Sequence, residues 1–159
     1  MGRRVVQPIQ GGKLMIKIAA ALMAATLAGA GTVETETELP YSENDLYVLS
    51  HIISAEAGNC DEDMMIAVGS VVLNRVSDDR FPDTIEEVVF QKDPLQYSPT
   101  ENGTYWDEPT KGAIEVAQML LEEGSKIPEG VVWQAEFPQG KETYDIKPIP
   151  WGGYMYFCY

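Results

Sequence analysis

The sequence is poor in the side chains that most often bind metals or act as nucleophiles. It has one histidine, His51, and two cysteines, Cys60 and Cys158, among 159 residues. Two cysteines and one histidine cannot supply the four ligands of a structural zinc site, so we expect no metal. Any Ser–His or Cys–His pair would have to use His51. On a helical wheel His51 lies away from the apolar face of its segment, which predicts a solvated surface side chain.

Glycine-rich phosphate loops and nucleophile elbows are also missing. The chain contains no G-x-x-x-x-G-K-[ST], no G-x-G-x-x-G and no G-x-S-x-G. The first two motifs carry phosphate and dinucleotide binding, and the third carries the serine of many hydrolases. We therefore expect no cofactor and no serine-hydrolase chemistry.

Basic residues are scarce beside acidic ones. The chain has 11 Lys and Arg against 25 Asp and Glu, a formal net charge of −14. Four of the basic residues and none of the acidic ones lie in residues 1–30, so residues 31–159 carry a charge of −18. So acidic a surface argues against nucleic acid and anionic membranes as partners.

Long apolar runs are absent, but one short run stands near the start of the chain. Residues 18–27, IAAALMAATL, follow four basic residues and precede Ala28-Gly29-Ala30. This order predicts a secretory signal peptide over 1–30, cleaved after Ala30. An uncleaved anchor is the alternative, and translation from Met15 is a further one. The acidic stretch 31–41 reads as a linker before a domain over 42–159.

An even number of cysteines in an exported chain suggests a Cys60–Cys158 disulfide. Two independent buried thiols are the alternative. Caps, apolar periodicity and β-branched or aromatic runs together predict an α+β fold, with helices first and a small antiparallel sheet at the end. The expected elements are helices over 42–58, 61–76, 84–90 and 110–124, a long loop over 91–109, strands over 131–137 and 154–159, and a turn within 146–153.

Glu56 breaks the apolar pattern of the first helix. With Leu46 as origin and about 100° per residue, Glu56 falls about 80° away, within the face that holds Leu49, Ile52 and Ile53. Burial disfavours the charged form of a carboxylic acid and raises its pKa. A carboxyl group protonated near neutral pH can act as a general acid, as in enzymes that cleave glycosidic bonds. The alternative is a helix-end side chain that reaches solvent.

Glycosidases commonly use a second carboxylate, but no spacing singles out one of Asp61, Asp93 and Glu101. Aromatic and amide side chains of the kind that contact sugar rings are present. They are Gln96, Tyr97, Asn102, Tyr105, Trp106 and Trp151. Each of these could equally be core or turn, and Trp133 is better read as core.

Several stretches, taken together, resemble the cell wall hydrolase family of the spore cortex-lytic enzyme SleB. They are DLYVLSHIISAEAGN, MIAVGSVVLNRVSDDRFPDTIEEVVF, LQYSP, ENGTYWDEPT and GGYMYFCY, within residues 45–159. The family pattern is A-E-A, then A-V-x-x-V-x-x-N-R-V, R-F-P-x-T, a Q-F-S-like loop and a closing G-H-x-F-Y strand. The resemblance implies a lysozyme- or transglycosylase-like helical region.

The resemblance also implies a lytic transglycosylase that cleaves peptidoglycan between N-acetylmuramic acid and N-acetylglucosamine. Its catalytic acid maps to Glu56, which would act first as acid and then as base, without a second carboxylate. The Q-F-S loop maps to Gln96, Tyr97 and Ser98, expected on the cleft wall.

The N-R pair of the pattern maps to Asn74 and Arg75. Asn74 is expected to tie its helix to neighbouring loops near the site, and Arg75 is expected to be structural. Tyr154 stands where the pattern has a closing His, so it would have to take over any contact of that His with substrate. A Cys60–Cys158 bond would fasten the catalytic helix to the closing strand.

Two other functions stay open: a hydrolysing muramidase of the same fold, and a non-catalytic wall-binding domain. We expect a secreted monomer that acts on peptidoglycan glycan strands. It would diffuse freely or depend on a targeting partner protein.

Overall fold

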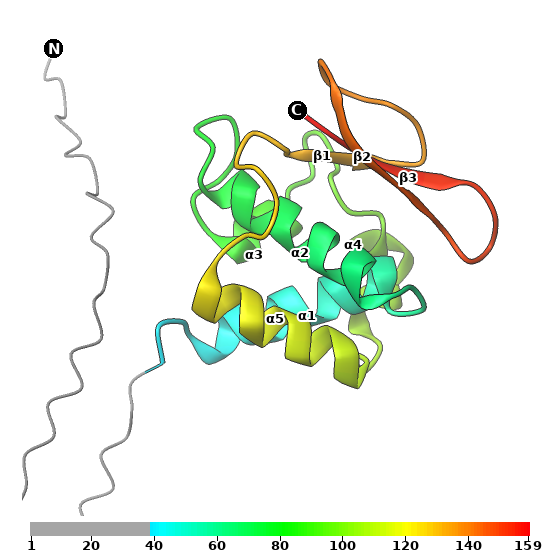
Figure 1. Cartoon of the computed structure of the whole chain (residues 1–159). Coiled ribbons are helices and arrows are strands. Elements are labelled where there is room, and N and C mark those ends of the chain that lie inside the picture. Colours follow the sequence, from blue (N-terminus) through cyan, green and yellow to red (C-terminus); the bar gives the residue numbers. More distant parts are fainter. Residues whose placement is uncertain (1–38) are drawn as a thin grey trace, which may run out of the picture. The chain divides into compact units, whose positions relative to one another are not determined.

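The computed structural model describes residues 39–159. The predicted signal peptide 1–30 and most of the predicted linker 31–41 lie outside the described residues. The chain forms α1 (Glu43–Ala57), α2 (Glu62–Val76), α3 (Ile85–Val89), α4 (Pro99–Asn102), the 3-10 helix η1 (Thr104–Trp106), α5 (Lys111–Glu123), β1 (Trp133–Ala135), β2 (Thr143–Pro148) and β3 (Tyr154–Cys158). The predicted α+β order is confirmed (Figure 1).

Side-chain caps set where the helices begin. Ser42 forms a capping box with Asp45 at the start of α1. Asp61 accepts from the backbone N–H of Met64 at α2, and Thr84 accepts from Glu87 at α3. Thr110 caps α5 in the same way. These contacts satisfy N–H groups that have no partner within the helix, which is why the predicted starts agree with the structure.

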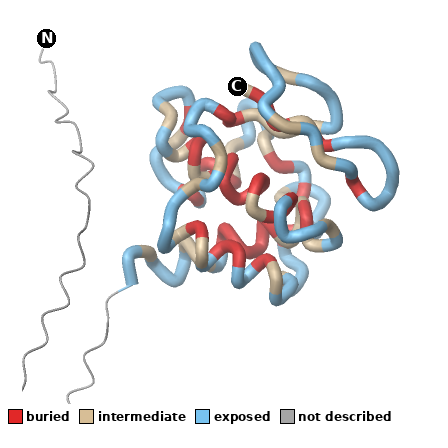
Figure 2. Tube along the Cα trace, viewed as in Figure 1, coloured by how far each residue is buried: buried red, intermediate tan, exposed pale blue. Residues whose placement is uncertain are grey.

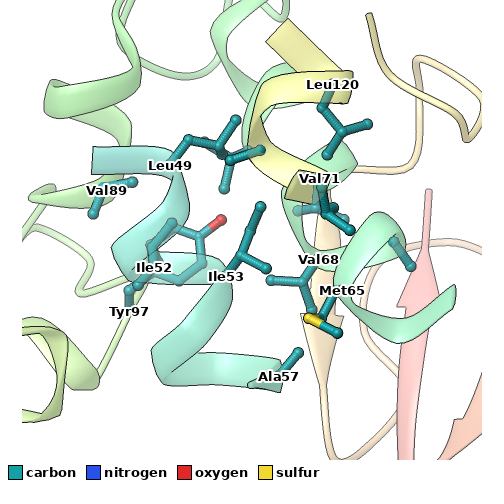
Figure 3. Close-up of a cluster of buried hydrophobic side chains, with 14 of the residues drawn as sticks. Leu49, Ile52, Ile53, Ala57, Met65, Val68, Val71, Val89, Tyr97 and Leu120 are labelled. Carbon is teal, nitrogen blue, oxygen red and sulfur yellow. The ribbon is translucent and has the colours of Figure 1, made fainter. Parts of the chain in front are cut away.

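The core lies where α1, α2 and α5 pack together. Leu49 and Ile53 of α1, Val68 and Val71 of α2 and Leu120 of α5 are fully buried. Figure 3 shows these side chains filling the space between the three helices, and Figure 2 marks the buried stretches of the trace in red. A Cβ at Gly69 of α2 would come within 2.5 Å of Leu120 and 2.6 Å of Ile53. The missing side chain therefore allows α2 to approach both neighbours.

The sheet is antiparallel with strand order β1-β3-β2. Met155 and Phe157 of the central strand β3 are buried and face the helices. The strands predicted over 131–137 and 154–159 form, although β1 covers only three residues. β2 occupies part of the stretch read as a turn, and the true turn follows it, with Gly152 and Gly153 at φ 99° and 100°. β2 is an edge strand with no buried residue, so it lacks the apolar alternation that marks a strand.

The predicted loop 91–109 contains α4 and η1, which are joined by Gly103 at φ 96°. This segment covers His51 of α1, whose predicted exposure is wrong. His51 is 6% exposed, and its Nδ1 lies 2.8 Å from the carbonyl oxygen of Tyr105. A wheel drawn for one helix does not reveal a loop that returns to cover its polar side.

Candidate functional site

Glu56 lies in the last turn of α1, half-buried, on the wall of a pocket of about 260 Å³. The pocket lies between the end of α1, the segment before α4, and strands β1 and β3. Its other lining residues are Leu95, Gln96, Ser98, Gln134, Ala135, Glu136 and Met155. Helix α1 therefore presents its one inward-facing carboxyl group to a polar hollow beside the sheet.

Burial raises the pKa of Glu56 from 4.5 to about 7, and the nearby charge of Arg75 opposes this rise. At neutral pH the group is then divided between its acid and its carboxylate. One side chain can thus give a proton and take one back near neutral pH, the condition for general acid–base catalysis.

Two of the predicted binding residues share the pocket with Glu56. Gln96 and Ser98 both line it, on the segment that enters α4. The amide of Gln96 donates to the carbonyl oxygen of Pro94 at 3.2 Å, which keeps this segment turned on itself. The pocket therefore has an amide and a hydroxyl opposite the acid, although substrate contact by either stays a prediction.

Tyr97, between them, points into the core instead of the pocket. Its side chain is fully buried and belongs to the same core cluster as Ile52 (Figure 3). The Arg75 guanidinium carbon is 5.0 Å from the Tyr97 ring centroid. Burial raises the pKa of Tyr97 to about 12. The expectation that Tyr97 lies on the cleft wall is wrong, because its ring occupies a core position against the Arg75 guanidinium while its neighbours Gln96 and Ser98 line the pocket.

Asn74 forms its hydrogen bonds with residues outside the pocket that holds Glu56. Its amide donates to the carbonyl oxygens of Pro128 at 2.8 Å and Val131 at 3.0 Å. It also borders a different pocket, of about 410 Å³, with residues of α5. The predicted tie between α2 and a neighbouring loop is confirmed, and the suggested closeness to the site is not.

Tyr154 begins β3, is 54% exposed and does not line the pocket, although the next residue, Met155, does. Asp61, Asp93 and Glu101 also lie outside the pocket lining. Trp106 borders another pocket with His51, while Tyr105 is buried. The aromatic surface expected from composition is therefore not gathered around Glu56.

Gln134 and Glu136 line the pocket and were missed from the sequence. They are the only polar side chains of the stretch VVWQAEF, two residues apart. Residues two apart on a strand point to the same side of a sheet. The spacing of these two polar residues could have marked them from the sequence alone. Glu136 gives the pocket a second carboxylate.

The predicted disulfide is contradicted, since both cysteines are free. Cys60 precedes the start of α2. Cys158 accepts at its carbonyl oxygen from Val132, whose own carbonyl accepts from Arg75 in the last turn of α2. A helix of 15 residues is about 22 Å long, whereas bridged Cα atoms lie within about 7 Å. The Cys158 thiol instead lies 3.7 Å from Oγ1 of Thr143.

Within residues 39–159 no group of three or more His, Cys, Asp or Glu side chains is placed to hold a metal ion. No helix in this same range has both the length and the apolar character needed to cross a membrane.

Known proteins share both sequence and fold with this chain. Residues 60–137 match the family model described as Cell Wall Hydrolase. The spore cortex-lytic enzyme of Oceanobacillus iheyensis is 32% identical over 85 residues, which is 54% of this chain and 30% of the relative. That of Halalkalibacterium halodurans is 30% identical over 118 residues, 73% of this chain and 32% of the relative. The chain thus spans about a third of the length of these relatives.

Two solved structures have the same fold. The catalytic domain of the germination-specific lytic transglycosylase SleB from Bacillus anthracis matches with a TM-score of 0.58 and 20% identity, over 74% of this chain and 97% of that domain. The SleB catalytic domain of Bacillus cereus also gives 0.58 and 20%, over 82% of this chain and all of that domain. The matched family segment begins four residues after Glu56, so the role of Glu56 depends on the pocket and the A-E-A motif. The resemblance to the cell wall hydrolase family is confirmed: residues 60–137 match that family, and the described domain has the fold of the SleB catalytic domains.

Proposed function

We propose that this chain is a peptidoglycan lytic transglycosylase that cleaves the β-1,4 bond between N-acetylmuramic acid and N-acetylglucosamine. The observation that carries this function is Glu56, a carboxyl group with its pKa raised to about 7 on the wall of a polar pocket. The names and fold of the relatives support the same substrate class.

In the proposed reaction Glu56 first gives its proton to the glycosidic oxygen while the bond from that oxygen to the anomeric carbon of muramic acid breaks. The Glu56 carboxylate then takes the proton of the muramic C6 hydroxyl, and that oxygen bonds to the anomeric carbon. The product is a 1,6-anhydro end, and no water is consumed. Glu56 ends the cycle protonated, as it began.

The remaining pocket residues fit a sugar with hydroxyl and acetamido groups. The amides of Gln96 and Gln134 can donate to and accept from such groups, and Ser98 adds a hydroxyl. Met155 offers an apolar surface for the C–H side of a ring. We assign these four residues to substrate binding on this basis.

Purified peptidoglycan digested by the wild type and by Glu56→Gln tests the assignment. The Gln variant keeps the shape of the side chain but loses the titrating proton. We expect the release of soluble muropeptides to fall at least 100-fold, in line with the loss of a general acid. Equal release by the two proteins, or none by the wild type, would remove the basis for the mechanism.

A hydrolysing muramidase is the second candidate, and Glu136 is the observation that favours it. A second carboxylate in the same pocket could activate a water molecule, as inverting glycosidases do. The two mechanisms separate at Glu136→Gln, which should abolish hydrolysis but leave transglycosylation within a few-fold of the wild type. A non-catalytic wall-binding domain, the third possibility, predicts binding of peptidoglycan without release of fragments by any variant.

The proposed substrate places the enzyme outside the cytoplasm, in agreement with the predicted signal peptide. Fractionation of cells that produce the full chain tests this location. The protein should be recovered outside the cytoplasmic fraction and should begin after Ala30. Recovery of the intact chain in the cytoplasm would contradict secretion.

A further inference from the structure

Arg75 is a buried cation without a carboxylate partner among the described residues. It is 2% exposed, and its Nε donates to the carbonyl oxygen of Val132 at 2.8 Å. Its Nη1 has no hydrogen-bond partner there, and none of the ion pairs found in residues 39–159 includes it. A buried charge without a counter-charge is costly, so a structural role alone accounts poorly for Arg at this position.

Tyr97 lies against this guanidinium. The Arg75 guanidinium carbon is 5.0 Å from the Tyr97 ring centroid and 5.2 Å from that of Phe81. The Tyr97 hydroxyl is buried, which raises its pKa, and close to the Arg75 side chain, which lowers it, but it makes no hydrogen bond of good geometry in the described part of the chain.

Tyr97 adjoins the pocket that holds Glu56 along the chain, and Arg75 packs against its ring. Gln96 and Ser98, which flank Tyr97, line that pocket. The charge of Arg75 lowers the pKa of Glu56, and the charges of Arg75 and Glu56 both act on the pKa of Tyr97. Glu136 is the other carboxylate on the pocket wall. Glu56 of α1, Arg75 of α2 and Tyr97 of the segment before α4 therefore lie within electrostatic reach of one another.

We propose that Arg75 and the Tyr97 hydroxyl are positioning residues that hold the Glu56 carboxyl group from its buried side and stabilise its charged form. This role rests on the proposed function, in which Glu56 must become a carboxylate in the first step and act as base in the second. Without a buried cation nearby, the carboxyl group would keep its proton and the first step would slow. The unpaired Nη1 and hydroxyl would be completed by Glu56 once it is charged.

Direct titration of Glu56 in the substrate-free protein tests the inference without any need for activity. The carboxyl carbon of Glu56 is followed by NMR in protein labelled at Glu, and its signal is assigned by its loss in Glu56→Gln. In Arg75→Met we expect its pKa to rise by about one unit or more, the scale of a lost neighbouring charge. Tyr97→Phe should raise it by less, and Arg75→Lys should restore the wild-type value.

Matched controls are present in the same chain. Arg80 is an exposed arginine paired with Asp78, so Arg80→Met removes a cation far more accessible to solvent. Tyr105 is a buried tyrosine whose hydroxyl also lacks a partner, but it packs beside His51. Neither Arg80→Met nor Tyr105→Phe should shift Glu56.

The pH profile of peptidoglycan cleavage supplies the second readout. The alkaline limb, which reports the loss of the Glu56 proton, should move to higher pH in Arg75→Met and return in Arg75→Lys. If Arg75→Met does not fold, Tyr97→Phe and Arg75→Lys decide. An unshifted Glu56 titration in every folded variant overturns the inference. A shifted titration in a protein that never cleaves glycan overturns the proposed function instead.

Discussion

The effect of Glu56 extends beyond the proposed reaction to the stability of the fold. Its pKa is about 7 in the folded chain against an ordinary 4.5, so the folded state binds more protons between these values. Stability from this group is complete below pH 4.5 and is lost as the pH rises through about 7. The acid to which we assign catalysis is therefore a cost to the fold above neutral pH.

Glu56→Gln should consequently be more stable than the wild type at pH 8, by up to about 3 kcal/mol, the free energy of a shift of this size. The two proteins should converge toward pH 4. Urea unfolding at both pH values measures the difference. A Gln variant that is less stable than the wild type at pH 8 would show that the carboxylate is well accommodated in the fold.

Single residues also mark what the sequence could reveal. Glu56 was identifiable because a wheel shows an acid on an apolar face, and Gln96 and Ser98 followed from a short motif. The pairing of Arg75 with Tyr97 joins α2 to a segment 22 residues further along the chain, and no local pattern predicts such contacts. The predicted disulfide between Cys60 and Cys158 is wrong for the same reason. An even number of cysteines does not reveal that helix α2 keeps the two residues apart.

At the scale of elements, the packing of α2 depends on Gly69. Gly69→Ala should destabilise the domain by about 1–3 kcal/mol, because a Cβ would overlap the side chains of Ile53 and Leu120. Thermal unfolding measures this loss. Gly112→Ala in α5 is the matched control, since its nearest neighbour is the flexible end of Met65 at 3.3 Å. Equal stability of Gly69→Ala and the wild type would mean that the helices can separate at no cost.

Elements with strong local signals were predictable and the others were not. Ser42, Asp61 and Thr110 cap helices through contacts with residues three positions away, so their sequence context is enough. β2 has no buried residue and is held by its pairing with β3, which lies beyond a turn. α4 and η1 are one turn each, too short for an apolar period to appear.

For the whole molecule, the two free cysteines predict that the stability of the fold does not depend on a disulfide bond. Titration of the unreduced protein under denaturing conditions should find two reactive thiols. A reducing agent should leave the unfolding midpoint unchanged, because no covalent bond holds the sheet to α1. Finding no free thiol would show that the native fold brings Cys60 and Cys158 together in a way this structure does not.

The whole fold sets one acid against a polar pocket, between the end of α1 and the sheet. Our central claim is that this acid cleaves glycan without adding water. Mass spectrometry of peptidoglycan digested in heavy-oxygen water tests the claim most directly. We predict muramic ends that lack one water and carry no heavy oxygen, formed by the wild type and not by Glu56→Gln. Reducing ends that carry the heavy oxygen would contradict it.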